Sequence, residues 1–82
     1  MNERERWYVE SDQNHTGWQV RRPNGSIVPL FTMKEDAIQY AAREAAARWE
    51  DDTVPTQLMI RRADGTFEDE RTYGLDPHPP EG

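Results

Sequence analysis

One short pattern occurs twice in this chain of 82 residues and holds the side chains best suited to chemistry. "VRRPNGSI" starts at Val20 and "IRRADGTF" starts at Ile60, and each places two arginines before an Asn-Gly or Asp-Gly turn. Guanidinium groups bind phosphates and carboxylates through several donors at once. If the arginines form a basic stripe at one end of a sheet, they are candidate contacts for nucleic acid. The four candidates are Arg21, Arg22, Arg61 and Arg62.

The charge balance favours another role for these arginines. A net charge of −6 repels nucleic-acid phosphates at long range. We therefore expect each arginine to pair with a nearby carboxylate, such as Glu10, Glu68 or Glu70, and to keep the sheet surface soluble. The same acidity leaves a further alternative open, in which the protein mimics nucleic acid and inhibits a DNA-binding protein.

Other reactive residue types lack the spacing that catalysis or metal binding requires. His15 lies in a predicted turn and His78 in a proline-rich tail, and the chain has no cysteine. Acidic runs at 50–52 and 68–70 lack the spacing of a calcium-binding loop, and no glycine-rich phosphate loop occurs. We therefore predict no catalytic, metal-binding or cofactor-binding residue, and a protein that is not an enzyme.

Alternating apolar residues and turn formers predict the elements that position these groups. Strands are expected at 6–11, 18–22, 27–31, 56–62 and 66–73, the third at an edge or broken because Pro29 cannot donate to a ladder. "TMKE" from Thr32 reads as a capping box that starts an alanine-rich helix continuing to about Glu50. Leu58, Ile60 and Phe67 are expected to point inward.

This order predicts an α+β domain in which two hairpin units (β-β-β-α-β-β) form an antiparallel sheet with a single helix on one face. The strand order between the hairpins cannot be inferred from the sequence. The expected organisation is a flexible N-terminus at 1–5, one domain at 6–73 and a proline-containing tail at 74–82, packed at most through Leu75. The aromatic residues predict a thin, aromatic-rich core.

One helix leaves the other sheet face without cover. Four residues are expected to make that face partly apolar: Tyr8, Val28, Leu30 and Met59. Such a face, or an edge strand, suits pairing with a second copy or with another protein. Scattered apolar residues also occur on sheet faces that bind nothing. We expect an interaction or self-association module, with nucleic-acid binding as the alternative.

Four segments resemble a family of small bacterial and phage proteins known as domain of unknown function 2188. They are "GWQV" at 17–20, "TMKEDAIQYAAREAA" at 32–46, "RRADGTFEDERTYG" at 61–74 and "DPHPP" at 76–80. The resemblance covers nearly the whole chain after Arg6, and the chain departs from it in the acidic segments "EDDTVP" and "FEDER". It implies a fold and no activity.

The composition also predicts where the protein is found. The chain has neither an apolar run at its N-terminus nor about 20 consecutive apolar residues, the length that spans a bilayer. Without cysteine it has no disulfides, which small secreted domains commonly need. We expect a soluble cytoplasmic protein with no membrane partner.

Overall fold

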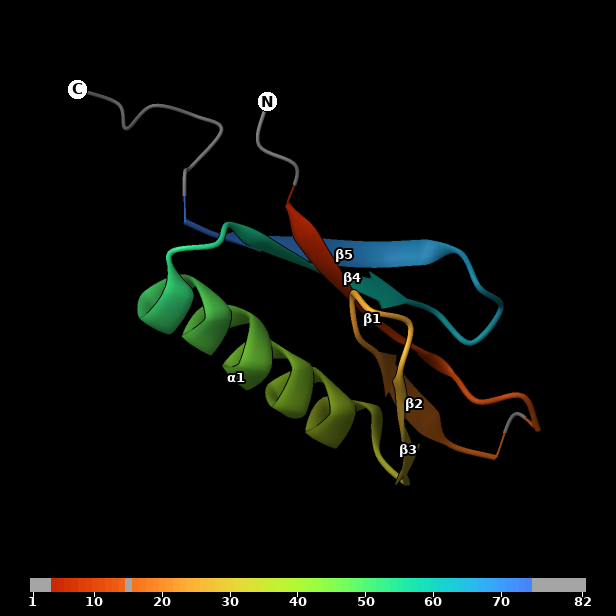
Figure 1. The fold of residues 1–82 in the computed structure, drawn as a ribbon. Coiled ribbons are helices and arrows are strands. Elements are labelled where there is room, and N and C mark those ends of the chain that lie inside the picture. Colours follow the sequence, from red (N-terminus) through yellow and green to blue (C-terminus); the bar gives the residue numbers. More distant parts are fainter. Residues whose placement is uncertain (1–3, 15, 75–82) are drawn as a thin grey trace.

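The computed structural model describes residues 4–14 and 16–74, which form a five-stranded sheet and one helix (Figure 1). The elements in chain order are β1 (Glu5–Ser11), β2 (Trp18–Arg21), β3 (Ile27–Phe31), α1 (Lys34–Asp52), β4 (Thr56–Arg61) and β5 (Phe67–Tyr73). The predicted element order is confirmed, with β1 beginning one residue earlier than expected. The predicted tail, including Leu75 and His78, lies outside the described residues, as do residues 1–3 and His15.

The sheet has the order β3-β2-β1-β4-β5 and is mixed. β1 pairs with β4 in parallel, from Glu5 opposite Thr56 to Val9 opposite Ile60, whereas the other three strand pairs are antiparallel. The prediction of an antiparallel sheet was therefore wrong. Because α1 returns the chain to the end at which β1 begins, β4 starts beside β1 and runs in the same direction.

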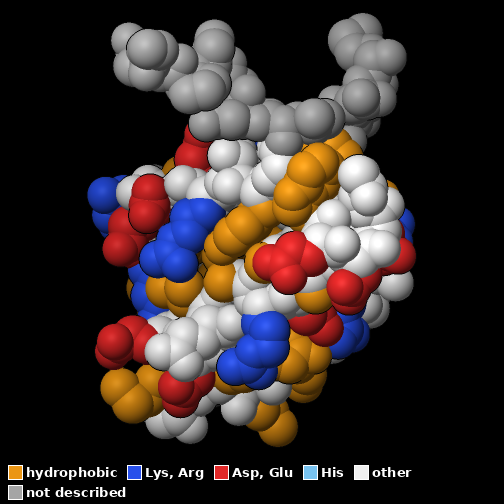
Figure 2. All heavy atoms as spheres, turned by 90° about the vertical axis from the view of Figure 1, so that its left-hand side faces the viewer, with side chains coloured by type: hydrophobic (Ala, Val, Ile, Leu, Met, Phe, Trp, Pro, Cys, Tyr) orange, Lys and Arg blue, Asp and Glu red, His pale blue; other side chains and the backbone are white. Residues whose placement is uncertain are grey.

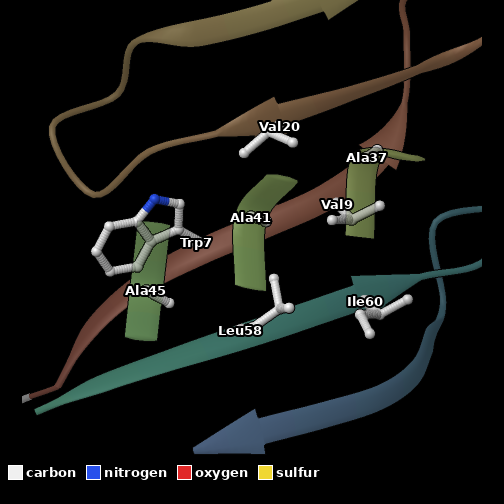
Figure 3. Close-up of a cluster of buried hydrophobic side chains, with 8 residues drawn as sticks. All are labelled: Trp7, Val9, Val20, Ala37, Ala41, Ala45, Leu58 and Ile60. Carbon is white, nitrogen blue, oxygen red and sulfur yellow. The ribbon is translucent and has the colours of Figure 1, made fainter. Parts of the chain in front are cut away.

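A thin core lies between α1 and the sheet (Figure 3). Its side chains are mostly aliphatic: Trp7, Val9, Val20, Ala37, Ala41, Ala45, Leu58 and Ile60. The three alanines lie one helical turn apart, which allows the helix backbone to approach the sheet closely. Most aromatic side chains surround this centre and are only partly buried, so the core is less aromatic than the composition suggested.

Both ends of α1 differ from the sequence prediction. The N-cap is Met33, in an extended conformation and without a side-chain hydrogen bond, so the capping box predicted at Thr32 does not form. The helix continues two residues past Glu50 and ends at Asp52. The C-cap is Thr53, whose left-handed φ of 58° turns the N–H of Val54 back toward the carbonyl of Arg48 at 3.5 Å.

The repeated pattern forms two hairpin turns with the same hydrogen bonds. The N–H of Arg22 donates to Ser26 at 2.9 Å and that of Arg62 to Thr66 at 2.7 Å, and in both turns the glycine has a φ of 90°. The side chain of Asn24 or Asp64 accepts from the backbone and hydroxyl two residues later. The Asn-Gly and Asp-Gly turns expected from the sequence are thereby confirmed, each with a left-handed glycine.

Two bulges change which side chains face α1. A register shift between Trp18 and Val20 places Val28 beside Val20 on the core side, so its assignment to the open face was wrong. A second shift, between Ile60 and Arg61, pairs Arg61 with Phe67, which is 50% exposed instead of buried as predicted. A bulge adds one residue to a strand and so moves the following side chains to the other face.

The end of β5 packs against the last turns of α1. Gly74 has a φ of 77°, and a Cβ atom placed on it would lie 2.2 Å from Cδ2 of Trp49. The Arg4 side chain donates to the carbonyls of Thr56, Tyr73 and Gly74. These contacts join the beginning of β1 to the end of β5. Within the described part of the chain, α1 is too polar to span a membrane.

Candidate functional site

The sheet face opposite α1 is uncovered by any described helix or strand and is organised in cross-strand rows. One row runs from β3 to β5 and contains Ile27, Arg21, Tyr8, Met59 and Glu70. The next contains Gln19, Glu10, Arg61 and Phe67. We call these nine residues the open face.

Two arginines stack on the aromatic rings of the open face. The guanidinium carbon of Arg21 lies 4.4 Å from the ring centre of Tyr8. That of Arg61 lies 5.4 Å from the same ring and 4.4 Å from the ring of Phe67. These distances are typical of cation–π contacts, so a guanidinium–aromatic ladder crosses four strands.

A single carboxylate serves both arginines. Glu10 accepts from Arg21 at 3.2 Å and from the amide of Gln19 at 2.8 Å, and it lies 3.9 Å from Nε of Arg61. That Nε atom is buried and has no hydrogen-bond partner among the described residues. Two guanidiniums therefore share this one carboxylate.

The other two arginines of the repeat lie elsewhere. Arg22 crosses to the helix side, where it makes two hydrogen bonds to Glu44 and one to the hydroxyl of Tyr40. Arg62 donates to Thr66 and to the carbonyl of Phe67 within its own hairpin.

The predicted basic stripe is not formed. β2 is antiparallel to β1 whereas β4 is parallel to it, so the two arginine turns point toward opposite ends of the sheet. Of the carboxylates expected to pair with these arginines, Glu10 serves Arg21 and Arg61, whereas Glu68 bonds Lys34 on α1.

Ion pairs on the helix side fix α1 against the sheet. The hydrogen bonds from Arg22 lower the pKa of the Glu44 carboxyl, and Glu44 also accepts from the indole of Trp7 at 3.1 Å. Glu5 raises the pKa of Arg48 through hydrogen bonds at 2.9 and 3.2 Å. These contacts give Arg22 a structural role.

Both sheet edges resist pairing with another strand. In β3, Pro29 lacks a donor and Leu30 has a φ of 72°, which confirms the predicted edge position. In β5, the Asp69 carboxylate accepts from the N–H of Glu70 at 2.8 Å. This side-chain contact occupies one backbone donor of the edge strand and so opposes regular strand pairing there.

Of the four apolar residues predicted for the uncovered sheet face, two lie there and two do not. Tyr8 and Met59 belong to the open face, Val28 packs on the core, and Leu30 projects from the edge strand with 85% of its surface exposed. Sequence reasoning missed Ile27 and Phe67, which pair with Arg21 and Arg61. The sequence carried a signal for both residues, since each is the apolar residue that ends one copy of the repeated pattern.

Two cavities flank the first residues of β1, beside the β2–β3 turn. A cavity of about 410 Å³ lies toward the open face and is lined mainly by arginines: Arg4, Arg6, Arg21 and Arg22. A cavity of about 590 Å³ lies toward α1, where Trp7 and Ala47 meet carboxylates and two arginines. Seen from the side on which α1 ends, charged side chains of both signs surround a band of hydrophobic ones (Figure 2).

In the part of the chain that the structure describes, no cluster of three or more His, Asp or Glu side chains has the arrangement of a metal site.

A family described as "Uncharacterized protein conserved in bacteria (DUF2188)" matches residues 7–73, which confirms the resemblance carried by the sequence segments above. No curated protein and no solved structure is significantly similar to the chain.

Proposed function

Because the chain belongs to this bacterial family, whose description assigns no activity, we propose from the structure that it is a non-enzymatic protein-interaction module that binds its partner through the open face. One observation carries the proposal, namely the guanidinium–aromatic ladder of Arg21, Tyr8, Arg61 and Phe67 on an uncovered sheet face. Protein interfaces are enriched in arginine, tyrosine, phenylalanine and methionine and are poor in lysine. The open face contains all four of the enriched types and no lysine, together with Glu10 and Glu70.

The exposed apolar residues support the same function. Ile27 and Phe67 are 41% and 50% exposed; Ile27 lies beside Arg21 at one end of the ladder, and Phe67 forms its other end. Their rings and methyl groups would lose contact with water if a partner covered the sheet. Since Pro29 and Leu30 interrupt the β3 edge and Asp69 occupies one donor of β5, we favour docking on the face over strand addition at β3 or β5.

Leu30 adds an independent argument. A left-handed conformation costs a non-glycine residue roughly 1–2 kcal/mol, and this leucine is also 85% exposed. Neither feature stabilises the isolated domain. Strained backbone positions cluster at functional sites, so we add Leu30 as a candidate contact of the partner.

Nucleic-acid binding has less support. Of the four candidate arginines, Arg22 and Arg62 are held by contacts within the domain and lie at different places. Arg21 and Arg61 share Glu10. The acidic-mimic alternative rests only on the net charge of −6. A second copy of the chain remains one form that a protein partner can take.

The test compares two substitutions that each add one negative charge. Met59→Glu changes the open face, whereas Gln39→Glu changes an exposed residue of α1. Light scattering after size exclusion measures self-association, and capture from lysate of the native host, with and without nuclease treatment, measures other partners. We expect Met59→Glu alone to abolish binding, with unchanged circular dichroism. Equal behaviour of both variants, or capture that disappears on nuclease treatment, would contradict the proposal.

A further inference from the structure

We propose that the 410 Å³ cavity at the end of β2 binds an anionic side chain of an extended peptide segment of the partner. This inference rests on the proposed function and adds the chemistry of the bound group. We call this cavity the arginine pocket; it lies beside Arg6, Tyr8 and Arg21.

The arginine pocket exists because β2 is shorter than β1. The pairing between them ends at Tyr8 opposite Arg21, so residues 5–7 of β1 extend past their last β2 partner. In Figure 3 the two strands diverge toward the end that carries Trp7. The β2–β3 turn then contributes Pro23 and Gly25 to the wall of the pocket.

The pocket has more positive charge than its internal partners neutralise. Arg6 donates from Nε to the side-chain amide of Gln57 at 2.9 Å, and no carboxylate among the described residues lies within ion-pair distance of it. Arg21 shares Glu10 with Arg61 and is 39% exposed. Glu5, the one carboxylate that lines the pocket, is bound to Arg48. An incoming anion therefore meets two guanidiniums with unused donors.

The backbone of β1 favours an extended chain as the carrier of that anion. The N–H of Glu5 donates to Pro55 on the β4 side at 3.0 Å. Because peptide groups alternate sides along a strand, those of Arg6 face the space beyond β2. A peptide lying there can bond to Arg6 as a short added strand, which places one side chain in the arginine pocket.

The second cavity specifies the neighbouring side chains of such a peptide. The 590 Å³ cavity lies on the α1 side of the same stretch and shares Glu5, Arg22 and Pro23 with the arginine pocket. Four carboxylates and two arginines line it, around Trp7 and Ala47. Successive side chains of an extended peptide point to opposite faces. The residues flanking the anionic one should therefore be basic, with stems that contact the apolar floor.

The test uses short capped peptides with a central residue flanked by lysines, titrated into the ¹⁵N-labelled protein. With glutamate or phosphoserine at the centre we expect saturable shifts of the backbone N–H of Arg6 and of Nε–H of Arg6 and Arg21. Central glutamine should weaken binding about tenfold or more, the loss of one charge-assisted contact. The glutamate and phosphoserine peptides distinguish a carboxylate from a phosphate ligand.

Two charge-matched variants provide the control. Arg6→Gln should weaken the glutamate peptide about tenfold, whereas Arg43→Gln, an exposed position on α1, should leave it unchanged. Equal binding of glutamate and glutamine peptides, shifts confined to other residues, or tighter binding of oligothymidylate in the same pocket would overturn the proposal. If the peptides fail while Met59→Glu still abolishes partner binding, the pocket assignment is wrong and the open-face function stands.

Discussion

Gly74→Ala should destabilise the domain more than the same change at Gly25. Gly74 has a φ of 77°, and the added methyl would lie 2.2, 2.4 and 2.6 Å from three ring atoms of Trp49. The left-handed conformation costs alanine roughly 1–2 kcal/mol, and overpacking of this kind costs a further ~1–3 kcal/mol. We therefore expect a loss of about 2–5 kcal/mol in the free energy of unfolding.

Gly25→Ala is the matched control. Gly25 has a φ of 90°, but nothing lies within 4 Å of the added methyl, so only the conformational cost of roughly 1–2 kcal/mol applies. Urea titration followed by circular dichroism measures both variants, with the slope compared to exclude a change in the unfolded state. In a Trp49→Leu background, the extra cost of Gly74→Ala should fall toward that of Gly25→Ala. Equal losses for the two variants in the wild-type background would refute the packing of Gly74 on Trp49.

Three further substitutions test other parts of the structure. Leu30→Gly should stabilise the isolated domain by about 0.5–1 kcal/mol, because glycine relieves the strain at a φ of 72° at some entropic cost; a lower melting temperature would contradict this. Thr56→Val should cost about 1 kcal/mol, because it removes the buried hydrogen bond of 2.8 Å from the threonine hydroxyl to the carbonyl of Ala45. Thr56→Ser keeps the donor and should retain that bond. Equal unfolding midpoints for the valine variant and the wild type would count against a stabilising role of this hydrogen bond. Glu44→Gln should reduce stability at pH 7, because Arg22 lowers the pKa of Glu44 in the folded protein. The difference in unfolding free energy from wild type should shrink as the pH falls below about 4.3, where the carboxylate becomes protonated. A difference that stays constant down to pH 2 would show that the ionised carboxylate does not contribute.

Local signals allowed much of the fold to be predicted. Asn24-Gly25 and Asp64-Gly65 specify their turns through contacts within four residues, and the alanine repeat specifies the buried stripe of α1. The parallel pairing of β1 with β4 joins residues about fifty positions apart. No local pattern encodes that choice, so the antiparallel sheet was a reasonable but incorrect inference.

The errors in the candidate site come from bulges. Strict alternation put Val28 on the open face and Phe67 in the core, and the register shifts near Val20 and Ile60 reversed both. The same alternation correctly put Tyr8 and Met59 on the open face, because β1 and β4 are regular there. The ion pair between Arg22 and Glu44 depends on where α1 packs against the sheet, and the sequence alone does not specify that position.

Photo-crosslinking in the native host tests the open-face proposal most directly. A photoreactive phenylalanine analogue replaces Ile27 or Phe67 on the open face, or Gln39 on α1, and digestion of each adduct with protease or nuclease identifies its nature. We predict protease-sensitive adducts, with another protein or with a second copy, from positions 27 and 67 and none from position 39. Adducts from position 39 alone, nuclease-sensitive adducts, or no adduct from either open-face position would contradict the assignment of this surface as the docking site.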